Sequence, residues 1–385
     1  MNDKIKLKDA CKILNGFAFK SGKYVDSGIR IIRIANVQKG YVEDEKPAFY
    51  PNSEESSIRD YMLKENDLLL SLTGNVGRVA LLDKKWLPAA LNQRVACLRI
   101  KDDRIINDYL YFALLSDKFE NDCIKSSKGI AQKNMSTEWL KDYEIPLPSE
   151  QKQREIVSSL KQLSTIIKNK TGQIQQLDNL IKARFVEMFG SEKCAILQDL
   201  SDKITDGSHM PPKGVEKSDY LMLSSQNIFD EINCDSARFL SKEDFESENK
   251  RTDIMDGDVL ITIVGTIGRT HVVRNGEKYV FQRSVGVIKP KRNKLNGVYL
   301  ASYLQTDKAK AFLASGAHGS SQKGIYLQDL KKLPVPLASI ELQNQFATFV
   351  SQVDKSKFAL GNELAMGNFY IRLIYDCIMH GRVDL

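Results

Sequence analysis

The sequence contains one pattern twice, at an interval of about 190 residues. Tyr109-Leu110 recurs 190 residues later as Tyr299-Leu300, and Gly74-x-x-Gly77-Arg78 recurs 191 residues later as Gly265-x-x-Gly268-Arg269. A one-residue insertion in a loop explains the difference between the two intervals. Because chance matches do not keep their register over roughly a hundred residues, we predict that the chain is one structural unit repeated in tandem.

Each copy ends in a long segment that is predicted to be helical. The segments follow Pro148 and Pro336, with Ser149 and Ser339 as N-caps, and their apolar residues recur at spacings of three and four. Such a stripe over about four heptads predicts a coiled-coil seam. The predicted seam comprises Leu160, Leu163, Ile167, Ile174, Leu177 and Ile181 in the first copy and Val350, Val353, Leu360, Leu364, Ile371 and Ile374 in the second, and its remaining positions hold Lys170, Arg184, Lys357 and Gly367.

Two arrangements of these helices are open. Each helix could pack only on its own domain, or the two helices could pair with each other. Pairing is favoured, because Gly172 and Gly367 are unfavourable in a lone helix and long helices gain stability mainly by packing an apolar face. Antiparallel pairing would relate the two copies by a pseudo-two-fold axis, which is also the symmetry of DNA.

The predicted fold class is α+β, with two globular domains in tandem, each followed by a long helix. The domains are expected at residues 1–147 and 191–337, and the helical spacers at 148–190 and 338–385. The Gly-x-x-Gly segments could cradle a phosphate with backbone N–H groups, but no Lys-Ser/Thr and helix follow, so a hairpin turn is favoured. Strands are expected at Ile29–Ile34, within Asn66–Gly74, at Arg78–Leu82, Val95–Ile100, within Gly257–Gly265 and at Ser284–Ile288, and helices at Asp108–Asp122 and Val298–Ala314.

Composition limits the class of protein. The net charge of +7 and the pI near 8.9 permit a nucleic-acid partner without requiring one. The six cysteines are scattered without a C-x-x-C pair, which favours reduced, mostly buried thiols in a cytoplasmic protein. No run of 18 apolar residues or signal-like N-terminus is present, so no membrane association is expected.

The segments that differ between the copies are the candidates for recognition. Residues 37–64 bear little likeness to 228–255, and 79–106 little to 270–296, which suggests two different binding surfaces on one scaffold. Arg, Asn and Gln side chains can make bidentate contacts to base edges, although a solvated surface position is the alternative for each residue alone. The candidate DNA-binding residues are Lys20, Lys23, Asn92, Gln93, Arg94, Lys128, Lys133, His209, Lys213, Gln282, Arg283, Ser321, Gln322 and Lys323.

Motifs of catalysis are missing from the sequence. There is no Walker A motif, no G-x-S-x-G and no G-x-G-x-x-G, and the four histidines lack the spacing of metal ligands. We therefore predict no catalytic residue and no metal site. Two alternatives stay open at this point, namely a stand-alone nuclease with a diffuse active site and an assembly scaffold that binds protein but not DNA.

The whole arrangement resembles the specificity subunit of a type I restriction-modification system. The resemblance rests on the tandem domains with their long helices and on motifs that occur in the same order in both halves. These motifs are Asn15–Ser21 and Thr205–Lys213 near the domain starts, Glu150–Gln153 and Ile340–Phe346 at the openings of the helices, and Arg184–Gly190 at the end of the first helix.

This resemblance implies two target-recognition domains that read a split DNA sequence, joined by an antiparallel coiled coil that acts as a ruler. It also implies double-stranded DNA, methyltransferase subunits and a restriction and translocase subunit as partners. S-adenosylmethionine, ATP and Mg²⁺ are then expected on those partner subunits, and no cofactor on this chain. The chain itself would be non-catalytic, and family members differ most in the recognition domains.

Overall fold

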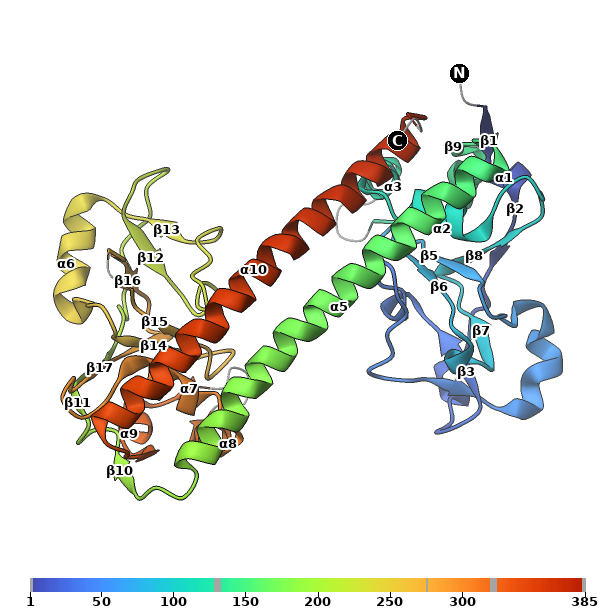
Figure 1. The fold of residues 1–385 in the computed structure, drawn as a ribbon. Coiled ribbons are helices and arrows are strands. Elements are labelled where there is room, and N and C mark those ends of the chain that lie inside the picture. The colour runs from blue at the N-terminus through green and yellow to red at the C-terminus, as the bar shows by residue number, and fades with distance from the viewer. Residues whose placement is uncertain (1–2, 128–132, 275, 319–323, 383–385) are drawn as a thin grey trace. The chain divides into compact units, whose positions relative to one another are not determined.

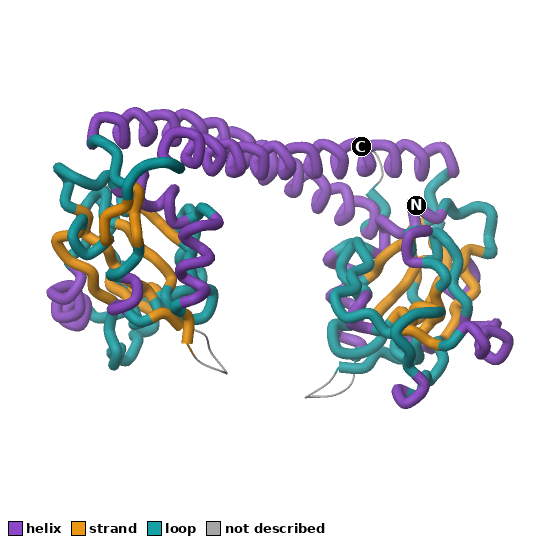
Figure 2. The backbone as a smooth tube through the Cα atoms, turned by 90° about the horizontal axis from the view of Figure 1, so that it is seen from below, coloured by secondary structure: helices purple, strands orange, loops and turns teal. Residues whose placement is uncertain are grey.

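The computed structural model describes residues 3–127, 133–274, 276–318 and 324–382 (Figure 1). The chain divides into two compact units, residues 1–170 with 363–385 and residues 171–362. Each unit therefore combines one globular domain with part of both long helices. Within each unit the strands gather in one body beside the helix segments (Figure 2).

The described residues of the first domain form three small sheets. Their neighbouring strands are antiparallel except for β3 and β7, which are parallel. The sheets are β2 (Cys11–Asn15), β8 (Val95–Ile100), β5 (Leu68–Ser71) and β6 (Val79–Leu81) in that spatial order; β4 (Phe49–Tyr50), β3 (Ile29–Ile32) and β7 (Ala89–Leu91); and β1 (Lys4–Lys6) with β9 (Glu144–Pro146).

The second domain repeats this topology, and among the described residues it has one strand pair more. Its four-stranded sheet has the order β11 (Ser201–Asp206), β17 (Val285–Pro290), β14 (Val259–Thr262) and β15 (Thr270–Val272). The other sheets are β13 (Arg238–Phe239), β12 (Leu221–Leu223) and β16 (Val280–Phe281); β10 (Cys194–Ile196) with β20 (Pro334–Pro336); and β18 (Ala317–His318) with β19 (Gly324–Ile325). The shared order confirms the tandem α+β fold, including strands in 79–106 and 270–296, where the side chains differ.

Strand β5 of the four-stranded sheet and its counterpart β14 are buried at every position, which explains why their first three residues are all apolar. Successive side chains of a strand point to opposite faces. Leu68 and Leu70 pack against the helices, whereas Leu69 packs against the three-stranded sheet. In the second unit Val259 and Leu260 divide in the same way between two clusters. The core of each domain therefore lies in two layers, one on each side of this sheet.

The helix predicted at Asp108–Asp122 is wrong as a single element. The structure has α2 (Asn107–Leu114) followed by α3 (Asp117–Ser126), and the Ser116 hydroxyl between them accepts a hydrogen bond from the Phe119 N–H at 3.2 Å. The helix predicted at Val298–Ala314 is likewise two helices, and Thr306 caps the second of them. A hydroxyl that captures a free N–H starts a new helix at its own position. The remaining helices are α1 (Leu7–Ala10), α4 (Thr137–Asp142), α6 (Lys242–Thr252), α7 (Gly297–Leu304), α8 (Asp307–Ser315) and α9 (Leu327–Leu330), with 3₁₀ turns at Ser21–Lys23, Ile34–Asn36, Asn52–Tyr61 and Lys84–Trp86.

Two long helices, α5 (Glu150–Phe189) and α10 (Ile340–Met379), pair antiparallel in each unit. In the first unit Lys170 of α5 forms an ion pair with Glu363 of α10. In the second unit the ion pair joins Lys357 of α10 to Asp178 of α5 at 2.7 Å. Partner numbers fall along α10 as they rise along α5, which confirms the predicted antiparallel pairing.

A glycine in the seam lets the helices approach closely. A Cβ atom added at Gly367 would lie 3.1 Å from Cγ1 of Ile167, so any larger residue would push against that side chain. Packing therefore explains why this seam position holds glycine and not a larger apolar residue. The apolar residues of the predicted seam are buried or half-buried in both helices.

Arg184 was expected in the seam, and this prediction is wrong. Its side chain is 45% exposed and pairs with Glu187, whereas the neighbouring Phe185 is 2% exposed and packs in the core. An α-helix has 3.6 residues per turn, so a pattern of 3.5 residues drifts around the helix and a step of four corrects it. That step falls between Ile181 and Phe185.

Both Gly-x-x-Gly segments form hairpin turns, as predicted. They join β5 to β6 and β14 to β15, which are antiparallel neighbours. Gly74 and Gly77 have φ angles of 72° and 86°, which residues with a side chain rarely adopt. The Gly77 N–H donates to the Ser71 carbonyl at 3.0 Å, and the Gly74 N–H donates to the Lys133 carbonyl at 2.9 Å. These donors are used inside the fold.

The cysteines are free thiols, but only half of them are buried. Cys11, Cys97 and Cys123 lie in the core, and burial raises the pKa of Cys11 to about 12. Cys194 and Cys234 are exposed, so the expectation of mostly buried thiols is not met. In the described part of the chain, no helix is both long and apolar enough to cross a membrane.

Candidate nucleic-acid interface

In both domains, loops that are far apart in the sequence meet at one end of the strands of the four-stranded sheet. We call this end of the sheet its edge. In an antiparallel sheet the start of one strand lies beside the end of its neighbour. The edge is therefore formed by the residues before β8 and those after β2 and β5, and in the second domain by the residues before β17 and those after β11 and β14.

The first edge brings together Asn92-Gln93-Arg94, the loop after Asn15 and the segment at Lys133. The Gln93 N–H donates to the Phe17 carbonyl at 3.0 Å, and the Leu72 N–H donates to the Arg94 carbonyl at 3.0 Å. Leu72 and Gly74 also bond to the backbone of the segment that holds Lys133. Gly16 packs so closely that a Cβ atom would lie 2.1 Å from the Asn92 carbonyl.

The second edge has the same backbone contacts. The Arg283 N–H donates to the Ser208 carbonyl at 2.9 Å, and the Ile263 N–H donates to the Ser284 carbonyl at 2.9 Å. A Cβ atom at Gly207 would lie 2.0 Å from the Phe281 carbonyl oxygen, so the glycine in each motif is required by the same close approach. Two parallel bridges mark the equivalence, Phe17 with Asn92 and Ser208 with Gln282.

The side chains at these equivalent positions differ in chemistry. The bridges align Gln93 with Arg283 and Arg94 with Ser284. Gln93, Arg94 and Arg283 are exposed, and Ser284 is half-buried with its hydroxyl accepting from the Ser225 N–H at 3.0 Å. Among the described residues, neither Arg94 nor Arg283 has a carboxylate partner, so both guanidinium groups are available to an acceptor such as a base edge.

Each motif loop is held by the insert that is specific to its own copy. In the first domain Glu54, in the 3₁₀ turn at Asn52–Tyr61, pairs with Lys23 at 2.6 Å. Their hydrogen bond and ion pair raise the pKa of Lys23 above its ordinary value. In the second domain Arg251 of α6 pairs with Asp206 at 2.5 Å. These insert residues were not identified from the sequence, because no local pattern marks a partner some 30 to 45 positions away.

The loop of the second domain presents polar and apolar groups together. The Asp206 carboxylate also contacts His209 Nε2 at 2.8 Å, and the Arg238 guanidinium donates to the Pro212 carbonyl at 2.7 Å. Between these anchors Met210 is 89% exposed. His209 is exposed as well, so an anchored loop holds both side chains at the surface beside Arg283.

Of the remaining predicted DNA-binding residues, the structure describes five and leaves four outside the described ranges. Lys20, Lys133 and Lys213 are exposed, and Asn92 and Gln282 are half-buried at the turns described above. Lys128, Ser321, Gln322 and Lys323 lie outside the described residues. The described segments that flank them belong to the same two edges, since the Gly74 N–H donates to the Lys133 carbonyl and the Ile325 N–H donates to the Ile263 carbonyl.

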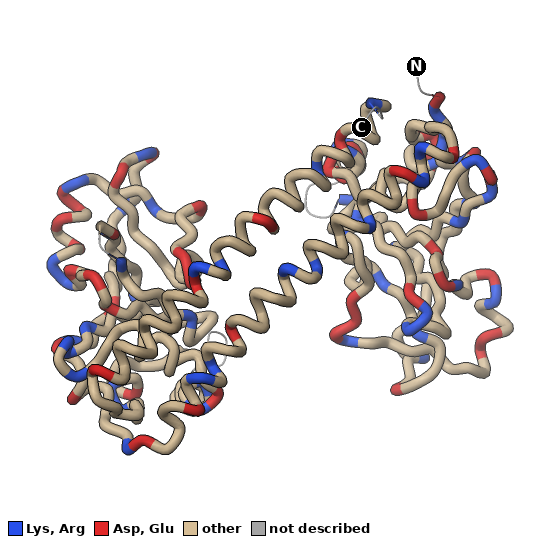
Figure 3. The backbone as a smooth tube through the Cα atoms, in the orientation of Figure 1, with Lys and Arg blue, Asp and Glu red and all other residues tan. Residues whose placement is uncertain are grey.

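Charges of both signs are interspersed along both units (Figure 3). The exposed polar and basic side chains at the two edges therefore indicate nucleic-acid binding more strongly than the net charge of +7 does. Within the described ranges, no group of three or more His, Cys, Asp or Glu side chains is arranged as metal ligands would be.

Comparisons with known proteins agree with this architecture. Residues 2–179 and 216–365 match the type I restriction modification DNA specificity domain. The chain is 24% identical over 405 residues to the EcoBI specificity subunit of a type I restriction enzyme from Escherichia coli, covering 95% of this chain and 82% of that relative. It is 28% identical over 182 residues to the MjaVIII specificity subunit of Methanocaldococcus jannaschii, covering 46% of this chain and 43% of that relative.

The fold is also similar to that of a solved structure. The S subunit of a type I restriction-modification system from M. genitalium superposes with a TM-score of 0.54 at 14% sequence identity, covering 98% of this chain and 96% of that one. At that identity the likeness concerns the fold alone. The family match covers both copies of the repeat. The chain therefore belongs to the family of type I restriction-modification DNA specificity proteins.

Proposed function

We propose that this chain is the sequence-reading subunit of a type I complex and that it recognises a bipartite, asymmetric DNA target. The observation that carries the proposal is the pair of equivalent sheet edges with different side chains, Gln93-Arg94 in one domain and Arg283-Ser284 in the other. An Arg side chain can contact guanine bidentately, and Gln can contact adenine. The same backbone frame with different donors and acceptors suits two half-sites of different sequence.

The chain is proposed to direct catalysis that other subunits perform. In this proposal methyltransferase subunits hold S-adenosylmethionine, a restriction and translocase subunit uses ATP and Mg²⁺, and this chain contributes no catalytic residue. The alternative of a stand-alone nuclease is tested by incubating the purified chain with target DNA and Mg²⁺, because cleavage by the chain alone would contradict the proposal.

Exchange of one domain tests the division of labour between the domains. Replacing residues 1–147 by the corresponding domain of a relative with a different target should change one half-site of the methylated sequence and leave the other unchanged. Methylated positions are mapped by sequencing DNA exposed to the assembled complex. The reciprocal exchange of residues 191–337 serves as the control and should change the other half-site. An assembly scaffold that binds no DNA predicts an unchanged target in both cases.

An apolar stripe on α10 is the proposed contact for a methyltransferase subunit. Met366, Phe369, Tyr370 and Leu373 are 58%, 63%, 48% and 43% exposed, and they recur at the spacing of three and four that places them on one helix face. This face lies beside the seam that holds Gly367 and Ile371. A contiguous exposed apolar patch of this kind is typical of a protein-protein contact.

Replacing Phe369 by serine should weaken binding of the methyltransferase subunit about 10- to 100-fold, since burying a Phe side chain contributes roughly 1.5–3 kcal/mol. The measurement is a titration of subunit assembly by calorimetry or analytical ultracentrifugation. Asn368→Ser is the matched control, because Asn368 is exposed on the same helix but lies outside the stripe. Equal losses for both variants would place the contact elsewhere.

A further inference from the structure

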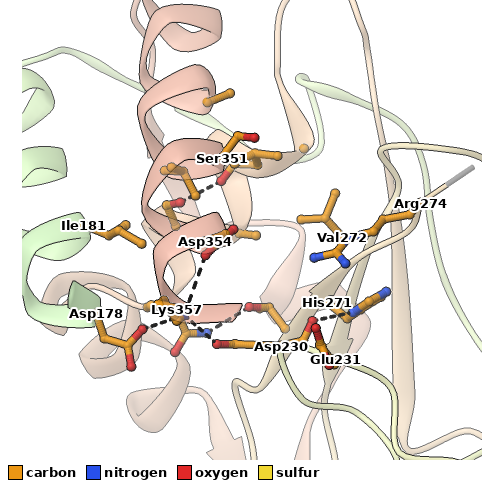
Figure 4. A pocket seen from close by; sticks show the side chains of 18 of the residues that line it. Asp178, Ile181, Asp230, Glu231, His271, Val272, Arg274, Ser351, Asp354 and Lys357 are labelled. Atoms are coloured by element: carbon orange, nitrogen blue, oxygen red, sulfur yellow. Dashed lines mark hydrogen bonds and ion pairs between the residues drawn. The ribbon is translucent and has the colours of Figure 1, made fainter. Parts of the chain in front are cut away.

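A lysine in the helix seam links the second domain to both long helices. Lys357 of α10 contacts Asp178 of α5 at 2.7 Å and Asp230 of the globular domain at 3.2 Å, and Asp354 lies one turn away at 3.7 Å (Figure 4). Its side chain is 17% exposed, whereas that of Asp230 is 78% exposed. These residues line a groove of about 1360 Å³ in the second unit.

The turn that carries Asp230 is fixed to the sheet of its own domain. His271 of β15 is 3% exposed, and its Nδ1 lies 2.9 Å from the Asp230 carbonyl oxygen. Its Nε2 lies 3.0 Å from the Glu277 carboxylate, so both ring nitrogens face acceptors. A continuous series of polar contacts thus runs from β15 through Asp230 and Lys357 to Asp178 on α5.

Packing of the seam does not explain this lysine. A single polar residue at a seam position usually reduces the stability of a coiled coil while specifying one arrangement. Ile167, at the equivalent position of α5, shows that the repeat can place an apolar residue there. The role of Lys357 is therefore explained by the two segments that it connects, α5 at Asp178 and the turn of the globular domain at Asp230.

Among the described residues of the first unit, no ion pair equivalent to Lys357 with Asp230 is found. At the repeat interval, Ile167 stands in place of Lys357, Lys39 in place of Asp230 and Ala80 in place of His271. Lys39 instead pairs within its own domain, with Asp117 at 2.6 Å and Glu120 at 2.7 Å, both on α3. In the part of the chain that the structure describes, the connection through Asp230 therefore belongs to the second copy.

We propose that Lys357 is a positioning residue that, through Asp230, fixes the orientation of the second recognition domain on its helix pair and makes the protein strict about the spacer between half-sites. The inference rests on the proposed bipartite recognition. One added base pair moves a half-site by about 3.4 Å and rotates it by roughly 35° about the DNA axis. A domain held in one orientation rejects such a site, whereas a domain that keeps its apolar contacts with the helices but loses the polar link through Asp230 can tilt and adapt to it.

The test uses Asp230→Ala in the full chain, assembled with its methyltransferase subunits. Methylation is measured on a DNA library in which the two half-sites are constant and the spacer is the preferred length or one base pair longer or shorter. Asp230→Ala should raise methylation at the non-preferred lengths, relative to the preferred one, about two- to fivefold. Glu231→Ala is the matched control, since Glu231 is the adjacent exposed carboxylate and, among the described residues, forms no ion pair with Lys357.

A second variant separates positioning from stability. Lys357→Met should widen spacer tolerance like Asp230→Ala, while the melting temperature stays equal or rises, because an apolar residue enters an apolar seam. Lys357→Arg should keep the wild-type spacer profile. A merely structural role predicts a lower melting temperature for Lys357→Met and an unchanged profile, which would overturn the proposal.

The outcomes also distinguish this inference from the proposed function. If Asp230→Ala and Lys357→Met both methylate with the wild-type spacer preference, the positioning role is wrong and bipartite recognition stands. If the wild-type complex methylates each half-site equally at every spacer length, bipartite recognition fails, and the positioning inference fails with it.

Discussion

Replacing Phe185 by alanine is expected to lower the free energy of unfolding of the second unit by about 3–5 kcal/mol. Phe185 is 2% exposed, and its ring lies 4.9 Å from the Tyr299 ring and 5.4 Å from the Phe346 ring, centroid to centroid. It also contacts Phe189 and Tyr303. The substitution removes the side chain from a cluster that joins α5, α7 and α10, and these elements cannot close the resulting cavity without shifting toward one another and losing their other contacts.

Urea or thermal denaturation followed by near-ultraviolet circular dichroism measures this loss, because the signal reports the packing of these aromatic rings. Arg184→Ala is the control, since Arg184 precedes Phe185 on α5 but is exposed and pairs with Glu187 on its own helix. That variant should change stability by less than about 0.5 kcal/mol. Comparable losses for the two variants would contradict the assignment of Phe185 to the seam.

Replacing Arg283 by alanine should weaken recognition of the second half-site by about 1–3 kcal/mol, which is roughly 5- to 150-fold. The guanidinium group is exposed at the sheet edge and has no carboxylate partner among the described residues, so its loss removes a contact without disrupting the fold. The Arg283 backbone N–H, which bonds to Ser208, is kept in the variant.

Competition binding with DNA probes altered in one half-site at a time measures this effect. Base substitutions in the second half-site should matter less to Arg283→Ala than to the wild-type protein, whereas substitutions in the first should matter equally. Arg94→Ala is the reciprocal control and should relax the first half-site instead. Equal loss at both half-sites in either variant would refute the proposal that each domain reads its own half.

The repeat and its long helices were predictable because they depend on patterns that are local or regular. The seam from Leu160 to Ile181 follows the helical period, and the matching positions from Val350 to Ile374 repeat it. The hairpin at Gly74 was predictable for the same reason, since its turn residues stand between two apolar strands. The boundaries of the shorter helices were not predictable in this way, because a hydroxyl such as that of Ser116 divides a helix without changing the apolar pattern.

The candidate interface was predictable only as a set of residue types. Arg94, Arg283 and His209 were selected by their chemistry, but nothing in the sequence places Phe17 against Asn92 or Ser208 against Gln282. Those contacts join segments about 75 positions apart. They follow from the order of strands in the sheet, which depends on packing over the whole domain.

The sequence by itself determined the tandem repeat, the α+β class, the helical seams and the family, because these depend on periodicity and on internal similarity. Only the tertiary structure decided that Phe185 and not Arg184 enters the seam, that Gly367 admits Ile167, and that Lys357 reaches Asp230. These features depend on the rotation of each helix and on side chains that meet only after folding. Their energies come from contacts between distant segments, which no local pattern specifies.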